Sequence, residues 1–148
     1  MAPKRRNNLD ADELATVMGQ FTRNFIRLPT TEKQSFITTS VLHTLTSEGP
    51  IRLTALTATE QITQSAVTQL VTRLERDGLV ERRPDPEDGR AVLVGVTPAG
   101  ARIIQTRQQD RVRRFTELME ALTPDEQHAI ADALPALARM AALMTSGH

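Results

Sequence analysis

The sequence of 148 residues contains no cysteine. This absence excludes disulfide bonds, thiolate catalysis, thiol redox sensing and zinc sites built from cysteine. No apolar stretch approaches the ~20 residues that a membrane-spanning helix needs. The opening segment, MAPKRRNNLDADEL, is basic but lacks the apolar core of a secretory signal. These absences predict a cytoplasmic protein that does not insert into a membrane.

Lysine is also scarce, because only Lys4 and Lys33 occur and every other basic residue is arginine. Arginine suits phosphate and base contacts, although a GC-rich coding sequence produces the same bias. Eighteen basic residues balance eighteen acidic ones, so the net charge is zero. A protein that binds nucleic acid non-specifically is usually basic. Any DNA binding must therefore depend on a local arrangement of residues.

Capping residues and apolar spacing of about 3.6 residues predict six helices. Their expected N-caps or first residues are Asp10, Thr31, Leu53, Thr63, Thr97 and Thr123. Two apolar runs between Leu79 and Val96 flank a charged tip and predict two strands. The expected fold class is mainly α with a small β-hairpin, in which Pro135 kinks the last helix.

The predicted helix from Gln64 to Arg76 has two different faces. One narrow arc is apolar and consists of Val67, Leu70, Val71 and Leu74. The opposite face is polar and carries Ser65, Thr68, Gln69, Thr72 and Arg76, with Arg73 on its flank. These residue types read base edges and phosphates in a major groove. From this helix alone, a plain solvated face is an equal alternative.

The elements around this helix favour DNA. A short helix, a three-residue turn and a longer helix form a helix-turn-helix, whose second helix enters the major groove. The hairpin that follows would add a wing. We expect Arg90 at its tip to enter a minor groove and Asp88 to pair with Arg90 or Arg73. Arg82 and Arg83 are expected to face phosphates.

The stretch that contains the helix-turn-helix and the hairpin resembles a known family. The run AVTQLVTRLERDGLVERRPDPEDGRAVLVGVTPAG closely resembles the multiple antibiotic resistance regulator (MarR) family of bacterial winged-helix repressors, most strongly over Leu53 to Gly100. The resemblance implies a winged helix-turn-helix at 31–97 and a helical dimerisation region formed by 1–30 and 98–148. It also implies an obligate homodimer that represses transcription from a pseudo-palindromic operator.

Two sets of site residues follow from the pattern and the resemblance. The expected DNA-binding residues are Arg52, Thr63, Gln64, Ser65, Thr68, Gln69, Thr72, Arg73, Arg76, Arg82, Arg83, Asp88 and Arg90. Family members commonly bind small aromatic or phenolic acids between the dimerisation helices and the winged domain. Candidate effector-binding residues are Met18, Phe21, Arg23, Phe25, Arg27 and His43. Each has a plainer interpretation as a core or surface residue, and His43 is expected to be buried.

The dimer also has support from composition. The last two predicted helices carry many apolar residues, namely Leu118, Met119, Leu122, Ile130, Leu134, Leu137, Met140 and Leu143. They exceed what two helices can hide against one small winged domain. The alternative is that the two helices cover each other as a hairpin.

Other functional classes have less support. The three histidines are scattered, and no catalytic grouping, metal-ligand spacing or phosphate loop occurs. We therefore expect no enzyme activity, no metal and no cofactor. Between 52 and 90, six arginines face seven acids, so the predicted module is not basic. That balance keeps open a second hypothesis, in which the winged helix binds protein instead of DNA.

Overall fold

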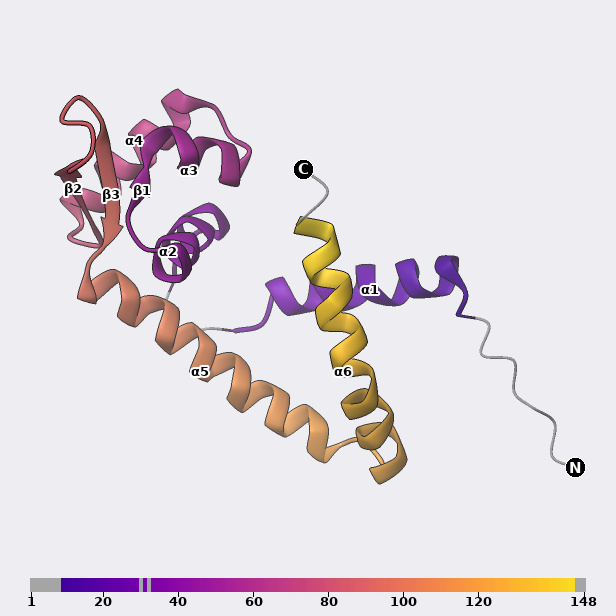
Figure 1. Ribbon diagram of the computed structural model, residues 1–148. Helices are drawn as coiled ribbons and strands as arrows, with labels where there is room; N and C mark the ends of the chain where they lie inside the picture. The colour runs from indigo at the N-terminus through magenta and orange to yellow at the C-terminus, as the bar shows by residue number, and fades with distance from the viewer. Residues whose placement is uncertain (1–8, 30, 32, 146–148) are drawn as a thin grey trace, which may run out of the picture.

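The computed structural model describes residues 9–29, 31 and 33–145, which form helices around a small sheet (Figure 1). The helices are α1 (Ala11–Ile26), α2 (Phe36–Glu48), α3 (Leu53–Glu60), α4 (Gln64–Arg76), α5 (Pro98–Glu120) and α6 (Pro124–Thr145). The strands are β1 (Ile51–Arg52), β2 (Val80–Pro84) and β3 (Val92–Val96), which pair antiparallel in the order β1-β3-β2. The predicted fold class is confirmed. Strand β1 was not predicted, because two residues are too short to show a period.

Most predicted helix starts are correct. The N-caps are confirmed at Asp10, Thr63, Thr97 and Thr123. The prediction of Thr31 is wrong, because α2 begins after Ser35, whose hydroxyl accepts an N–H from the first turn (3.3 Å). The backbone N–H of Thr31 instead donates to Asp110 on α5 (2.7 Å). The chain before Ser35 is therefore attached to α5 and does not start a helix.

The buried apolar core of the described chain lies entirely between Val41 and Ile103. It consists of Val41, Leu42, Leu45, Leu56, Val67, Leu70, Val71, Leu74, Val80, Val94 and Ile103. The predicted apolar face of α4 is thus confirmed residue by residue. Helices α2, α3 and α4 and the sheet enclose this core, while only the first turns of α5 reach it. We call this part, residues 36–97 with the start of α5, the winged domain.

Helix α5 begins directly against the winged domain. The Thr97 hydroxyl donates to the carbonyl oxygen of Gly78 (2.7 Å), and its backbone N–H donates to that of Leu79 (3.0 Å). Gly100 is buried, and a Cβ there would collide with the carbonyl oxygen of Leu79 and lie 2.8 Å from Val96 Cγ2. Only glycine permits this close approach, which explains the Thr-Pro-x-Gly pattern at the start of α5.

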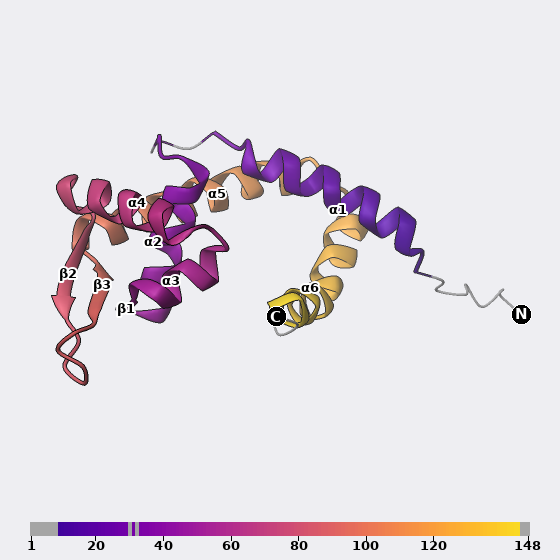
Figure 2. The same cartoon turned by 90° about the horizontal axis from the view of Figure 1, so that it is seen from above.

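Helices α1 and α6 and the distal part of α5 extend away from the winged domain (Figures 1 and 2). We call these three segments the outer helices. None of the described residues of α1 is buried, and α1 meets α5 through the rings of Phe21, Phe25 and Phe115, with centroids 5.9 to 6.1 Å apart. Pro135 lies inside α6, which continues through it. Within the described ranges, no helix is both long and apolar enough to cross a membrane.

Candidate nucleic-acid interface

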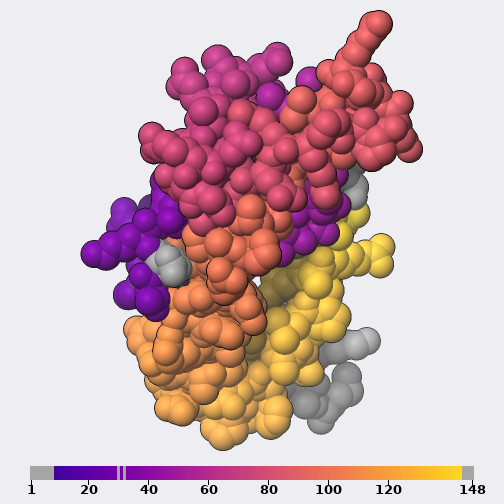
Figure 3. All heavy atoms as spheres, turned by 90° about the vertical axis from the view of Figure 1, so that its left-hand side faces the viewer, coloured from indigo at the N-terminus to yellow at the C-terminus, as the bar shows by residue number. Residues whose placement is uncertain are grey.

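Helix α4 and the hairpin lie at one end of the molecule, and the turn between α5 and α6 lies at the other end (Figure 3). Helix α3 ends at Glu60, and Gln61 adopts a left-handed backbone conformation with φ 53°. The chain thereby turns sharply, and the Thr63 hydroxyl accepts the N–H of Ala66 to start α4 (3.3 Å). This is a helix-turn-helix with α4 in the position of the recognition helix. The β2–β3 hairpin that follows is the wing.

The polar face of α4 is turned to solvent. Its exposed residues are Gln64, Ser65, Thr68, Gln69, Thr72, Arg73 and Arg76. Five of them line a shallow hollow of about 350 Å³: Thr68, Gln69, Thr72, Arg73 and Arg76. The exposure of this face is as predicted, and the contact of these residues with DNA stays a prediction. Because no acidic residue lines this hollow, the face suits the electronegative surface of a duplex.

Two arginines near α4 are engaged within the protein. Arg82 on β2 forms an ion pair with Glu75 (2.8 Å) and donates to the Thr72 hydroxyl (2.9 Å). Arg73 reaches inward to the Thr38 hydroxyl at 3.5 Å. Arg82 thus connects the wing to the recognition helix. The sequence predicted only phosphate contacts for Arg82 and did not reveal this connection.

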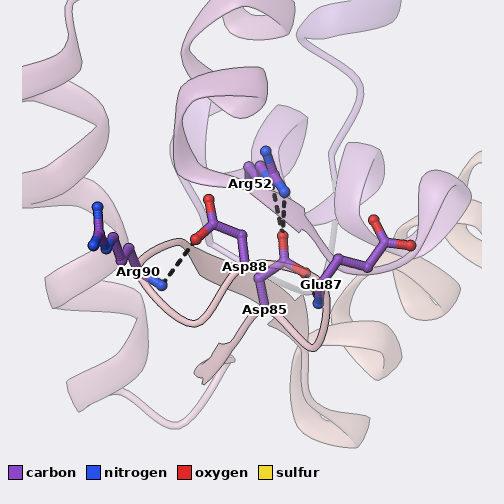
Figure 4. Close-up of polar contacts among 5 residues, drawn as sticks. All are labelled: Arg52, Asp85, Glu87, Asp88 and Arg90. Atoms are coloured by element: carbon purple, nitrogen blue, oxygen red, sulfur yellow. Dashed lines mark hydrogen bonds and ion pairs between the residues drawn. The ribbon is translucent and has the colours of Figure 1, made fainter.

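An ion pair holds the base of the wing (Figure 4). The Nε and Nη2 groups of Arg52 both donate to Asp85 Oδ2 at 2.7 Å, and the backbone N–H of Glu87 donates to Oδ1 at 2.9 Å. The hydrogen bond from Glu87, followed by that from Arg52, lowers the pKa of Asp85, which is only 6% exposed. Asp85 in turn raises the pKa of Arg52. Arg52 was predicted as a DNA contact, and its role toward Asp85 was missed because the two residues are 33 positions apart.

The tip of the wing differs from the prediction. Asp88 accepts a hydrogen bond from the backbone N–H of Arg90 (3.1 Å) and not from a guanidinium group. The expected pairing of Asp88 with the Arg90 or Arg73 side chain is therefore wrong, because Asp88 stabilises the turn itself. The Arg90 side chain is exposed and points away from the other labelled residues (Figure 4). It remains available for contact with a phosphate or a groove.

A cavity of about 290 Å³ lies where α1, α2 and α5 meet. Its lining residues are Phe25, Ile26, Gln34, Phe36, Thr39, Ser40, His43, Arg107 and Arg111. Phe25 and His43 were predicted here. His43 is exposed, so the expectation of burial is wrong: its side chain faces this open cavity and not the core.

The other predicted effector-binding residues do not line this cavity. Phe21 lies in a separate apolar hollow beside Phe115, and Arg27 lines another beside Asp110. Met18 and Arg23 line none of these three hollows. The family resemblance had implied that all six candidates line one site between the dimerisation helices and the winged domain.

Two arginines of the cavity were missed. The Arg111 guanidinium lies 4.5 Å from the centroid of the Phe25 ring. Burial, together with the positive charge of Arg107, lowers the pKa of Arg111. The two arginines are four residues apart on α5, so they share a helix face. That spacing was the available signal, but nothing local connected it with Phe25. Among the described residues, no cluster of three or more histidine or acidic side chains could hold a metal ion.

The fold and this interface define a winged helix-turn-helix protein. The chain belongs to the MarR family, whose sequence profile matches residues 38–92. Its relatives include a helix-turn-helix (HTH)-type transcriptional regulator of Mycobacterium leprae, 32% identical over 94 residues, or 64% of this chain. The HTH-type transcriptional repressor IacR of Pseudomonas putida is 31% identical over 110 residues, or 74% of this chain. Each alignment spans 66% of the relative's length.

The solved structures agree with this assignment. A mutant of Escherichia coli MarR superposes with a TM-score of 0.70 at 26% identity, covering 87% of this chain and 96% of that chain. The family consists of transcriptional regulators and not of enzymes.

Proposed function

We propose that this protein is a homodimeric, sequence-specific DNA-binding repressor that acts in the cytoplasm. The observation that carries the proposal is the exposed face of α4, which is rich in Thr, Gln and Arg and has no acid lining its hollow, beside a projecting wing (Figure 3). Helix α4 enters a major groove, and Arg90 follows the adjacent backbone or minor groove. The name of the Pseudomonas putida relative supports repression as the outcome.

The outer helices support the dimer. They expose large apolar side chains: Val17, Phe21, Leu118, Met119, Ile130, Leu134, Met140 and Leu143. An apolar surface of this extent requires a partner, and the hairpin alternative leaves these residues uncovered. A second copy covers the same helices by two-fold symmetry, so residues 9–29 and 98–145 form the dimerisation region. A single mass of about one chain by light scattering at micromolar concentration would contradict this part.

A two-fold dimer requires a two-fold operator. Two copies of α4 read the halves of an inverted repeat whose centres lie about one DNA turn, ~10 bp, apart. The test is selection of bound duplexes from a random DNA pool at near-physiological salt. We expect enrichment of an inverted repeat with that spacing. Enrichment of a single half-site without symmetry would contradict the dimeric arrangement.

The cavity at the crossing of α1, α2 and α5 fits an aromatic or phenolic acid. Phe36 offers an exposed ring and Phe25 an apolar wall, and Arg107 and Arg111 offer positive charge for a carboxylate. This cavity lies between the winged domain and the outer helices, where a ligand shifts the spacing of the two α4 helices if it binds one arrangement better. Benzoate and salicylate are suitable first probes, with release from the selected operator as the readout. Arg111→Gln should abolish release while operator binding persists.

The neutral charge balance favours one alternative, a winged helix that binds protein. Between 52 and 90 the acids outnumber the arginines. Two of these acids, Asp85 and Glu75, form ion pairs with Arg52 and Arg82. The DNA selection separates the two functions. If the protein is folded and dimeric but enriches no DNA sequence, protein recognition becomes the favoured function.

A further inference from the structure

The threonines on the exposed face of α4 have already used their hydroxyl hydrogens. The Thr68 hydroxyl donates to the carbonyl oxygen of Gln64, and the Thr72 hydroxyl donates to that of Thr68, both at 2.8 Å. A hydroxyl group has only one hydrogen to donate. Neither threonine can therefore donate to a base without breaking a bond of its own helix.

Thr72 is constrained a second time, from the wing. Arg82 Nη2 donates to Thr72 Oγ1 at 2.9 Å, while its Nη1 is held by Glu75 at 2.8 Å. The hydroxyl group of Thr72 thus donates its hydrogen to one partner and accepts through its oxygen from another, which fixes the rotation of the side chain. Strand β2 packs against α4, so this connection is part of the fold (Figure 1). The hydroxyl of Thr72 has no hydrogen left to donate, and the methyl group is the apolar part of the side chain that makes none of these bonds.

The neighbouring glutamine offers a contrast. Gln69 is exposed on the same face, and within the described chain its side-chain amide makes no hydrogen bond. It keeps both its donor and its acceptor for an adenine edge. Thr72 and Gln69 are three residues apart, so they lie side by side on the helix. The face therefore presents a free amide next to a methyl group.

We propose that Thr72 selects bases through its methyl group, by packing against the 5-methyl of a thymine, with Arg82 as the residue that positions it. The inference rests on the proposed entry of α4 into the major groove, where the thymine methyl is accessible. It names the chemistry of one contact: apolar at Thr72 and hydrogen-bonding at Gln69.

The experiment begins with the inverted repeat selected by the wild-type protein. Each thymine of both half-sites is replaced in turn by deoxyuridine, which removes only the methyl group. One position should lower affinity by roughly fourfold per half-site, the effect of one buried methyl. Thr72→Val keeps a methyl, whose rotamer the helix itself restricts, so it should stay sensitive to that replacement although the hydrogen bond from Arg82 is lost. Thr72→Ser, which lacks the methyl, should bind the unmodified operator as weakly as wild type binds the deoxyuridine operator. Its affinity should not change further when deoxyuridine replaces that thymine.

A matched control is Thr46→Ser on α2, because Thr46 makes the same hydroxyl-to-carbonyl bond to Leu42 (2.7 Å) away from α4. It should bind the operator like wild type. Two results overturn the inference: normal binding by Thr72→Ser with loss by Thr72→Val, or indifference of wild type to every deoxyuridine. Failure of wild type to enrich any DNA sequence overturns the proposed function itself, and with it this contact. Thermal unfolding of each variant confirms that affinity, and not folding, has changed.

Discussion

The winged domain and the outer helices differ in how far they bury their large apolar side chains. In the winged domain, α2, α3, α4 and the sheet bury Leu42, Leu56 and Val71 completely. On the outer helices, Phe21 and Leu134 remain 51% and 57% exposed. The first region has a core of its own, whereas the second leaves large apolar side chains exposed in the single chain. One short chain thus contains both a unit with its own core and the exposed apolar faces that we propose as half of a dimer interface.

The largest contrast comes from the same substitution placed in each region. Gly100→Ala forces a Cβ onto the backbone of Leu79, so we expect a loss of about 3 kcal/mol or more in the free energy of unfolding. A Cβ added at Gly19 meets nothing within 4 Å, because Gly19 lies opposite the apolar face of α1. It should stabilise the protein by about 0.5–1 kcal/mol. Urea denaturation measures both, and equal effects would remove the distinction between the regions.

A second contrast compares two leucines. Leu42→Ala leaves a cavity in the winged domain and should lower the free energy of unfolding by about 2–5 kcal/mol, without changing dimer dissociation. Leu134→Ala should instead weaken association, by about 2 kcal/mol per protomer. Sedimentation equilibrium measures association, and denaturation at several protein concentrations measures unfolding. If Leu134→Ala leaves the dissociation constant unchanged, α6 does not form the interface.

The third contrast concerns the wing, whose base is held by the ion pair between Arg52 and Asp85. The pKa of Asp85 is lowered by hydrogen bonds from Glu87 and Arg52, so its stabilising effect is present above its ordinary pKa of about 3.9 and is lost as the pH falls below it. Asp85→Asn should therefore be less acid-sensitive than wild type below about pH 4, and should bind the operator more weakly at neutral pH. Arg52→Gln removes the second cause only and should show a smaller change. Identical acid unfolding of Asp85→Asn and wild type would contradict this account.

The smallest effect is expected at the tip of the wing. Arg90→Ala should weaken binding to all sequences alike and reduce the slope of log affinity against log salt by about 1 per lost phosphate contact. Arg139→Ala, an exposed arginine on α6, is the control from the other region and should leave the slope unchanged. Unaltered binding by Arg90→Ala would show that the wing does not touch DNA.

The local parts of the structure followed from the sequence. Thr63, Thr97 and Thr123 cap their helices as predicted, because capping depends on residues three apart. The inner face of α4 also followed, because helical periodicity determines which side chains share a face. The same reasoning separated the exposed polar face of α4 that forms the candidate interface.

The parts that could not be predicted are contacts between distant residues. Arg52 with Asp85, and Arg82 with Thr72, join different elements, and no local pattern indicates such pairs. Thr31 has a capping pattern but is bound by Asp110, 79 residues away. His43 was expected to be buried, yet it is exposed on the side of α2 that faces the open cavity. In each of these positions the tertiary structure, and not the local sequence pattern, determines what the side chain contacts.

The length of α5 has a mechanical consequence. Its 23 residues run unbroken from the winged domain to the turn before α6, a rod of roughly 34 Å at about 1.5 Å per residue. Tilting such a rod by about 10° around its outer end displaces the other end by roughly 6 Å, nearly two steps of about 3.4 Å along a DNA strand. If α4 binds DNA as proposed, a small angular change at the crossing of α1 and α5 would therefore change the register of α4 on the duplex.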